Sequence, residues 1–328
     1  MEEAQQTESK NRQVHKESNK NPDQKERFYF SKRKWLRILT EFVGTYFVVF
    51  TIMAATCWIT LTSLSPVYLG IVAFCAYAGS AAVFQGISGA HFNPAVSFAM
   101  ALSSRLSWLD ALYYAIAQIV GAICASATLF GLLKFMPSDL NVTSQQWWEL
   151  LANTFDSSAS DRIKVGPGFA IVIELISAFI VMALVLKAVH SNGKPRRSYY
   201  FLSALGYGTA TILASFFTGG GFNPAKATGA AIMAGAAGVP GVGAELWLFW
   251  IIPLLCAAVC ALINTIYQGM GKNRAKDESA EGSQGEKEID EEEENREEEE
   301  NREEEEEGKK SLNAKKEVGS EENEGAKD

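Results

Sequence analysis

A long stretch of this 328-residue chain carries almost no charge, and that feature limits the possible folds more than any other. Residues 36–270 contain ten Lys or Arg and eight Asp or Glu, whereas residues 271–328 contain eleven and twenty-four. A water-soluble domain of that size needs far more polar surface than eighteen charged residues supply. The middle of the chain is therefore predicted to lie in a membrane. A soluble enzyme is excluded, and no nucleic-acid partner is expected.

Six segments are long and apolar enough to cross a hydrocarbon core, which takes about 20 helical residues. Their approximate ranges are 36–61, 67–87, 108–134, 167–189, 199–217 and 244–268. Two further apolar segments, 94–102 and 224–234, have about half that length, so each must enter the membrane and return or pack inside the protein. The predicted fold class is an all-α membrane protein with six transmembrane helices and two re-entrant half-helices.

Positive charges predict the orientation of these spans. They fall before the first span, after the first half-segment, between the fourth and fifth spans and after the sixth: Lys32, Arg33, Lys34, Arg105, Lys187, Lys194, Arg196, Arg197, Lys272, Arg274 and Lys276. Six spans place all of them on one side, which the positive-inside rule makes cytoplasmic, together with both termini. The opposite side carries the mainly acidic loop 135–166, whose Asn141-Val142-Thr143 is a glycosylation acceptor. The plasma membrane is favoured over an internal membrane.

The membrane part is an internal duplication of about 36–134 and 167–268. Glu41 in the first half corresponds to Glu174 in the second, and Phe92-Asn93-Pro94-Ala95 corresponds to Phe222-Asn223-Pro224-Ala225. The Glu-to-Asn separation is 93 − 41 = 52 in one half and 223 − 174 = 49 in the other. Three spans in each half give the halves opposite orientations. We therefore expect an inverted repeat with a site at its interface, near the middle of the bilayer.

Each Asn-Pro-Ala motif predicts the start of a short helix, because Asn is a good N-cap and Pro suits the first helical turn. In an inverted repeat the two helix starts, at Asn93-Pro94-Ala95 and Asn223-Pro224-Ala225, meet at the membrane centre with their positive dipole ends together. Cations, including protons moving along a file of water, would be repelled there. If the Asn oxygens cap the helices, the amide groups can donate into the lumen. The pattern therefore indicates a narrow, neutral pore.

These motifs resemble the major intrinsic protein family, which comprises the aquaporins and glycerol facilitators. The matching segments are Glu41-Phe42-Val43-Gly44-Thr45, Ser88-Gly89-Ala90-His91-Phe92-Asn93-Pro94-Ala95-Val96, Ala117-Gln118-Ile119-Val120-Gly121-Ala122, Gly221-Phe222-Asn223-Pro224-Ala225 and Trp247-Leu248-Phe249-Trp250-Ile251-Ile252-Pro253. They cover about residues 35–270 and neither tail. The resemblance implies an hourglass fold with one pore per chain, a homotetramer in the lipid bilayer, and no cofactor, metal or catalytic residue.

The resemblance also implies a selectivity filter of four residues near the external mouth. Ungapped counting from the two motifs puts Ala73, Thr211, Gly220 and Lys226 there, with Phe74 as an alternative at the first position. Family members usually carry Arg where this chain has Lys226 and include an aromatic residue, so this filter would be wider than usual. Two alternatives stay open for Lys226: its ammonium group faces the pore, or it extends to the external interface while backbone carbonyls define the path.

Other positions bear on solute choice and on loop support. Ala227, Ala231 and the pair Phe249-Trp250 resemble water channels more than glycerol facilitators. By resemblance, Glu41 and Glu174 accept hydrogen bonds from loop backbone, and His91 braces a loop or lines the pore. The cysteines lie in apolar stretches and are predicted to be buried free thiols: Cys57, Cys75, Cys124, Cys256 and Cys260.

The sequence therefore predicts a passive water channel, with small neutral solutes left open. The alternatives are a facilitator of glycerol or similar solutes, and a structural or adhesion protein whose pore is closed. Residues 1–35 are expected to be a polar cytoplasmic tail, 36–270 the channel domain and 271–328 an acidic, disordered cytoplasmic tail. Because 288–307 is almost continuous Glu, the last tail is expected to be solvated or to bind a basic partner.

Overall fold

The structure is a computed structural model that describes residues 33–65, 67–155, 163–270 and 296. Within this part, six helices are long and apolar enough to cross a membrane, as predicted: α3 (Lys34–Leu61), α4 (Val67–Phe84), α6 (Trp108–Leu133), α8 (Pro167–Lys187), α9 (Tyr199–Thr218) and a C-terminal helix, Val242–Met270. The described residues up to Thr265 form one compact unit, which contains the candidate site.

Two half-length helices also match the prediction, and one further helix was not predicted. The half-helices are α5 (Pro94–Leu102) and α10 (Pro224–Ala236). The loop between α6 and α8 contains a short 3₁₀ turn, Ser138–Leu140, and α7 (Ser144–Leu151). A capping box between Thr143 and Gln146 starts α7, whose buried face includes Trp147 and Trp148. Its eight residues are too few and too polar to resemble a membrane span, so the length of apolar segments alone does not predict this helix.

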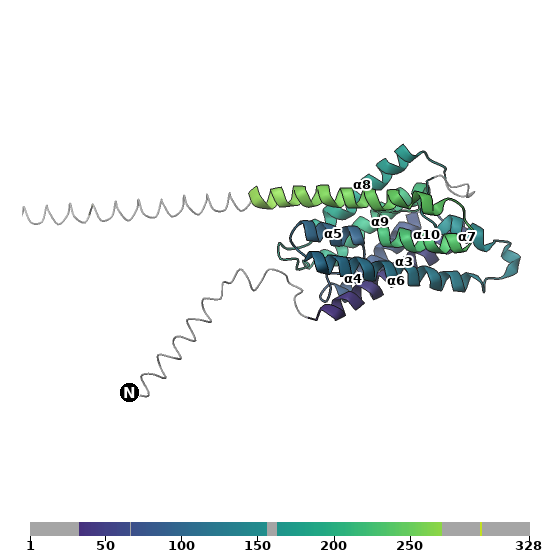
Figure 1. Ribbon diagram of the computed structural model, residues 1–328, viewed down its shortest axis with the longest axis horizontal. Coiled ribbons are helices and arrows are strands. Elements are labelled where there is room, and N and C mark those ends of the chain that lie inside the picture. Colours follow the sequence, from purple (N-terminus) through teal and green to yellow (C-terminus); the bar gives the residue numbers. More distant parts are fainter. Residues whose placement is uncertain (1–32, 66, 156–162, 271–295, 297–328) are drawn as a thin grey trace, which may run out of the picture. The chain divides into compact units, whose positions relative to one another are not determined.

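The long helices pack as two groups of three around the half-helices. In the first repeat α3 contacts α4 and α6, and in the second α8 contacts α9. The groups meet where α4 packs against α9 and where α10 packs against α6. Figure 1 shows α5 and α10 between the long helices, placed along one line. This is the arrangement expected of an inverted repeat, and it brings the two half-helix starts together.

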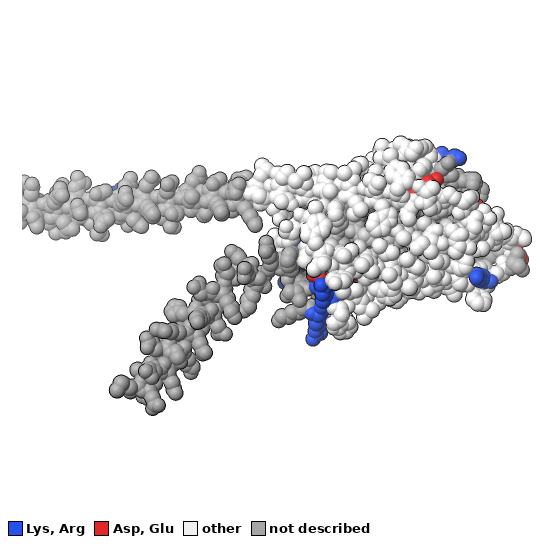
Figure 2. Space-filling view, in the orientation of Figure 1, with Lys and Arg blue, Asp and Glu red and all other residues white. Residues whose placement is uncertain are grey.

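The outer surface of the bundle is apolar along its length. Many large apolar side chains are exposed there, including Phe47, Val83, Ile116 and Leu262. In Figure 2 the face between the two ends of the bundle has almost no charged side chains, and the Lys and Arg residues of the described part gather toward the ends. A surface of this kind suits hydrocarbon and would be unstable in water.

The cysteine prediction is partly wrong. Cys57, Cys256 and Cys260 are buried, but Cys124 is half-buried and Cys75 is exposed. An apolar segment does not reveal its inward face when its outer face must also be apolar, so burial of Cys75 could not be inferred from its surroundings in the sequence.

Candidate functional site

Both half-helices begin at an Asn that caps its own helix. Asn93 Oδ1 accepts a hydrogen bond from the Ala95 amide at 2.9 Å. Asn223 Oδ1 accepts from the Ala225 amide at 3.1 Å and from the Lys226 amide at 3.5 Å. Pro94 and Pro224 follow at the first helical position, as the motif predicts. Both side-chain oxygens are therefore occupied, and the amide groups are free to donate elsewhere.

The two helix starts contact each other through these amides. Asn93 Nδ2 donates to the Phe222 carbonyl at 3.2 Å, and Asn223 Nδ2 donates to the Phe92 carbonyl at 2.8 Å. Both Asn side chains are buried. The positive ends of two helix dipoles therefore face the same buried region, which opposes the presence of a cation there.

Glu41 on α3 accepts four hydrogen bonds, three from the loop before α5 and one from Gln118 on α6. Its Oε1 accepts from Ser88 Oγ at 2.6 Å and from the His91 amide at 3.0 Å. Its Oε2 accepts from the Phe92 amide and from Gln118 Nε2, both at 2.8 Å. A buried carboxylate with this many donors fixes the loop that leads into the Asn-Pro-Ala motif.

Glu174 on α8 occupies the equivalent place in the second repeat with fewer partners. Its Oε1 accepts from Thr218 Oγ1 and from the Gly221 amide, the latter at 2.8 Å. Its Oε2 is buried and has no hydrogen-bond partner within the described residues. The two repeats therefore brace their half-helices in the same way but to different extents.

His91 lies beside the first half-helix. Its Nδ1 is 3.2 Å from Ser97 Oγ, and its ring lies edge-on to Tyr114 with centroids 5.4 Å apart. Gln118, for which the sequence suggested no separate role, links this region by donating to Ser97 Oγ at 3.0 Å as well as to Glu41. These contacts tie α5 to α6 and leave the His91 ring packed between the two helices.

A cavity of about 340 Å³ lies at the end of the bundle that carries α7. Its wall includes Thr56 and Thr60 of α3, Ser215 of α9 and Lys226 of α10, and α7 contributes apolar side chains. A water molecule takes about 30 Å³ in the liquid, so the cavity has room for several. Lys226 in its wall lies three residues beyond Asn223, so the first turn of α10 forms part of this wall.

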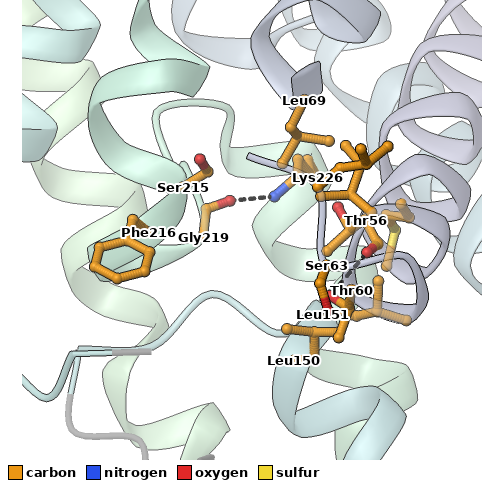
Figure 3. Close-up of a pocket in the computed structure, with 13 residues that line it drawn as sticks. Thr56, Thr60, Ser63, Leu69, Leu150, Leu151, Ser215, Phe216, Gly219 and Lys226 are labelled. Atoms are coloured by element: carbon orange, nitrogen blue, oxygen red, sulfur yellow. Dashed lines mark hydrogen bonds between the residues drawn. The ribbon is translucent and has the colours of Figure 1, made fainter. Parts of the chain in front are cut away.

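Lys226 is held at the wall of this cavity. Its Nζ donates to the carbonyl of Gly219 at 2.8 Å (Figure 3) and to that of Gly220 at 3.3 Å. Both glycines have left-handed backbone, with φ of 78° and 67°, a conformation that is costly for other residues. Nζ also donates to Asn153 Oδ1 at 3.1 Å, and the Lys226 side chain is only 8% exposed. The ammonium group therefore stays at the cavity instead of extending outward.

Asn153 was not identified from the sequence. It follows α7 in the loop between the two repeats, and its Nδ2 donates to the Thr218 carbonyl at 3.0 Å while its Oδ1 binds Lys226. It thus connects the loop to the end of α9 and to α10. No local motif marks this residue, because its partners lie 65 and 73 residues away in the chain.

Tyr77 of α4 and Tyr207 of α9, called here the tyrosine pair, contact each other deeper in the bundle. Their ring centroids are 3.4 Å apart and their planes differ by 4°. Asn223 Nδ2 also donates to Tyr77 Oη, at 3.1 Å. Neither tyrosine belongs to a motif that marks it as functional in the sequence.

Two of the predicted filter residues, Ala73 and Thr211, lie along α4 and α9 between the cavity wall and the tyrosine pair. Leu69 and Ser215 line the cavity, and Ala73 and Thr211 come one turn further inward on α4 and α9. Ala73 is buried, and Thr211 Oγ1 donates to a carbonyl of its own helix at 2.7 Å. Phe74, the alternative to Ala73, packs its ring edge-on against Phe201 of α9, which is exposed at the outer surface.

The other predicted features lie away from this region. Asn141 is exposed in the loop after α6, as a glycosylation acceptor must be, and its Nδ2 donates to the Asp139 carbonyl at 3.3 Å. Among the described residues, no group of three or more His, Cys, Asp or Glu side chains is placed to hold a metal ion.

Comparison with known proteins gives one consistent family. A family model described as "Major intrinsic protein" matches residues 29–264. The chain is 34% identical over 232 residues to "Glycerol uptake facilitator protein-like 6" of Lactiplantibacillus plantarum, covering 69% of this chain and 97% of the relative. It is 30% identical over 234 residues to "Aquaporin-5" of Sus scrofa, covering 69% and 78%. Its fold is similar to the X-ray structure of the aquaglyceroporin from Plasmodium falciparum, with a TM-score of 0.58 at 23% identity, covering 72% and 95%.

Proposed function

Because this chain belongs to the major intrinsic protein family, we propose that it conducts water passively along a path from the α7 cavity, past Lys226, to the two Asn residues. The chain is a multi-pass membrane protein that acts as a passive channel and not as an enzyme. The observation that carries this proposal is the meeting of the two half-helix starts through Asn93 and Asn223.

The central region explains how water could pass while cations are rejected. Each Asn amide is a neutral donor, so it can exchange hydrogen bonds with water without holding it as tightly as a charge would. Two positive dipole ends raise the energy of any cation at the same place. Lys226 adds a fixed positive charge on the route from the cavity, which supports exclusion of cations from that end.

Small neutral solutes are a second candidate cargo. One similar protein is named for glycerol uptake and another is an aquaporin, at nearly equal identity. The filter proposed for this chain, Ala73, Thr211, Gly220 and Lys226, contains no aromatic side chain and would be wide. Against that, Ala227, Ala231 and Phe249-Trp250 resemble the water-channel type. We therefore propose water as the main cargo and treat glycerol as a permeant of lower flux.

The experiment that tests this proposal is stopped-flow light scattering on liposomes containing the purified protein. An osmotic step with an impermeant solute measures water flux, and a step with glycerol measures solute flux. Fast water flux with slow glycerol flux supports a water channel, and fast flux of both supports a glycerol facilitator. Flux equal to that of empty liposomes would instead support the closed structural or adhesion protein.

We further propose that the channel comprises residues 36–270, that both termini are cytoplasmic, and that the protein forms homotetramers in the plasma membrane. The positive-inside rule and the exposed Asn141 acceptor support the orientation. The tails, 1–35 and 271–328, lie outside the described residues except for residues 33–35 and 296. A basic partner for the acidic segment 288–307 is therefore proposed from its sequence alone.

A further inference from the structure

The tyrosine pair occupies equivalent positions in the two repeats. Tyr77 lies 93 − 77 = 16 residues before the first Asn, and Tyr207 lies 223 − 207 = 16 residues before the second. The same site on the duplicated frame therefore carries a large aromatic ring twice, and the inverted symmetry brings the two rings face to face. Both side chains are almost fully buried, at 3% and 1% exposure.

The pair lies on the line that leads inward from the cavity. Leu69 and Ser215 form part of the cavity wall, and the tyrosines follow eight residues further in along α4 and α9. Four helical residues rise about 6 Å, so the pair is about 12 Å, or two turns, below that wall. Its depth matches that of the half-helix starts, because Tyr77 Oη accepts from Asn223 Nδ2 at 3.1 Å.

The stacking leaves no passage between the rings. The ring centroids are 3.4 Å apart in planes that differ by only 4°, whereas aromatic pairs in proteins usually keep centroids about 4.5–7 Å apart. Carbon atoms at about 3.5–4.0 Å are already in van der Waals contact, so a water molecule cannot enter between rings at this spacing. Water on this route must go around the rings or wait until they separate.

The pair also occupies a donor that a passing water would use. Asn223 Nδ2 has two hydrogens, of which one is bound by the Phe92 carbonyl at 2.8 Å and the other by Tyr77 Oη. A water molecule at this point would have to replace the Tyr77 hydroxyl. The Tyr207 ring meanwhile contacts the Phe222 ring, with centroids 6.0 Å apart, just before the same Asn.

We propose that Tyr77 and Tyr207 form a closed gate at the centre of the pore, so that water passes only when the two rings separate. The inference rests on the proposed function, because a gate has meaning only in a conducting path. It adds that the tyrosine pair limits the rate of water flux in addition to the filter around Lys226. A closed centre also excludes glycerol more strongly than water, whatever the width of the filter.

The test is unit water permeability of reconstituted protein, measured by stopped flow for wild type, Tyr77→Val, Tyr207→Val and the double variant. Replacing both rings by valine opens the centre, and we expect permeability to rise at least about tenfold. Each single variant should have a permeability between those of wild type and the double variant. Tyr77→Phe/Tyr207→Phe keeps the stacked rings but frees the Asn223 donor from Tyr77 Oη, so its permeability should stay well below that of the valine pair. Tyr200→Val is the matched control, because Tyr200 is on the same helix but is 41% exposed at the outer surface.

The outcomes separate the gate from the channel. If wild type already conducts fast and the valine variants match it, the gate is overturned while the water channel stands. If every variant, including the double one, stays at the level of empty liposomes, the water path itself is overturned. If the phenylalanine pair conducts as fast as the valine pair, ring stacking does not close the pore. The single variants keep the test decisive if the double variant does not fold.

Discussion

Glu41 in the first repeat and Glu174 in the second brace their half-helices to different degrees. Glu41 accepts four hydrogen bonds, from the loop and from Gln118 on α6. Glu174 accepts two, both on one oxygen. The first half-helix is thus tied to the surrounding bundle by more donors than the second. The duplicated frame is the same, but the number of hydrogen bonds that hold each half-helix is unequal.

The two repeats also differ at the position three residues after each Asn. The first repeat has Val96, which is buried and apolar, and the second has Lys226, which lines the cavity. The predicted filter residues Ala73, Thr211 and Gly220 have counterparts at the same distance from the Asn of the other repeat. These counterparts are also small and uncharged: Ser203, Ala81 and Ala90. Duplication therefore supplies a symmetric frame and centre, while Lys226 makes the corresponding places in the two repeats differ in charge.

The largest difference between the repeats is expected in the thermal stability of the variants Glu41→Gln and Glu174→Gln. Glu41→Gln turns an NH2 group toward two buried donors, each of which costs about 1–3 kcal/mol when left unpaired. In Glu174→Gln the NH2 group can take the place of Oε2, which has no hydrogen-bond partner within the described residues, while the remaining oxygen keeps both donors. This variant should therefore lose much less thermal stability. Thermal unfolding of the purified protein in detergent measures both.

Glu149→Gln on α7 is the control, because this side chain is partly exposed and outside both braces. Equal losses of thermal stability for Glu41→Gln and Glu174→Gln would contradict the unequal bracing.

Asn93→Asp and Asn223→Asp test the centre, where the repeats are most alike. Each change replaces a donor by a charged acceptor facing a carbonyl, and the charge also lowers the barrier to cations. We expect water flux to fall about tenfold or proton leak to appear, with the greater effect at Asn223, because its bond to Phe92 is shorter and it also contacts Tyr77. Stopped-flow water flux and a pH-sensitive dye inside the liposomes report both. Correctly inserted variants that match wild type in both measurements would remove the central role of these residues.

The parts of this architecture that the sequence predicted depend on length and repetition. Spans and half-helices follow from apolar lengths, and the meeting of Asn93 with Asn223 follows from two matched motifs in inverted halves. Asn153 could not be found in this way, since its role depends on how a loop folds back onto Lys226. The tyrosine pair shares a 16-residue spacing that the sequence does contain. The sequence does not tell how α4 and α9 are oriented about their own axes. For this reason it does not distinguish a tyrosine that faces the pore from one that faces lipid, such as Tyr200.

Variants of Lys226 test the end of the proposed pore at which the two repeats differ most. Lys226→Arg supplies a planar, more rigid donor group and should reduce glycerol flux a few-fold more than water flux. Lys226→Ala removes the charge and should widen the filter and weaken exclusion of cations, although the helix dipoles still oppose protons. Paired water and glycerol permeabilities, with conductance, measure these effects at equal protein density.

Asn153→Ala should have a smaller effect in the same direction as Lys226→Ala, because it removes one of the oxygens that hold the ammonium group. Val96→Ala is the control from the first repeat. If all the Lys226 variants behave like wild type, the filter must be assigned to other residues.

The smallest effect is expected from mercurials, which bind thiolates. Gly220 carries no thiol, and Cys75, the cysteine of α4, lies on an exposed face and not on the buried line of Leu69 and Ala73. Water flux should therefore change by less than about twofold on treatment, with or without Cys75→Ser, because a reagent at the outer face does not obstruct the path. Ser215→Cys places a thiol in the cavity wall and should create inhibition that a reducing agent reverses. Strong inhibition of wild type that survives Cys75→Ser and Cys57→Ser would mean that the lumen follows a different face of α4 and α9.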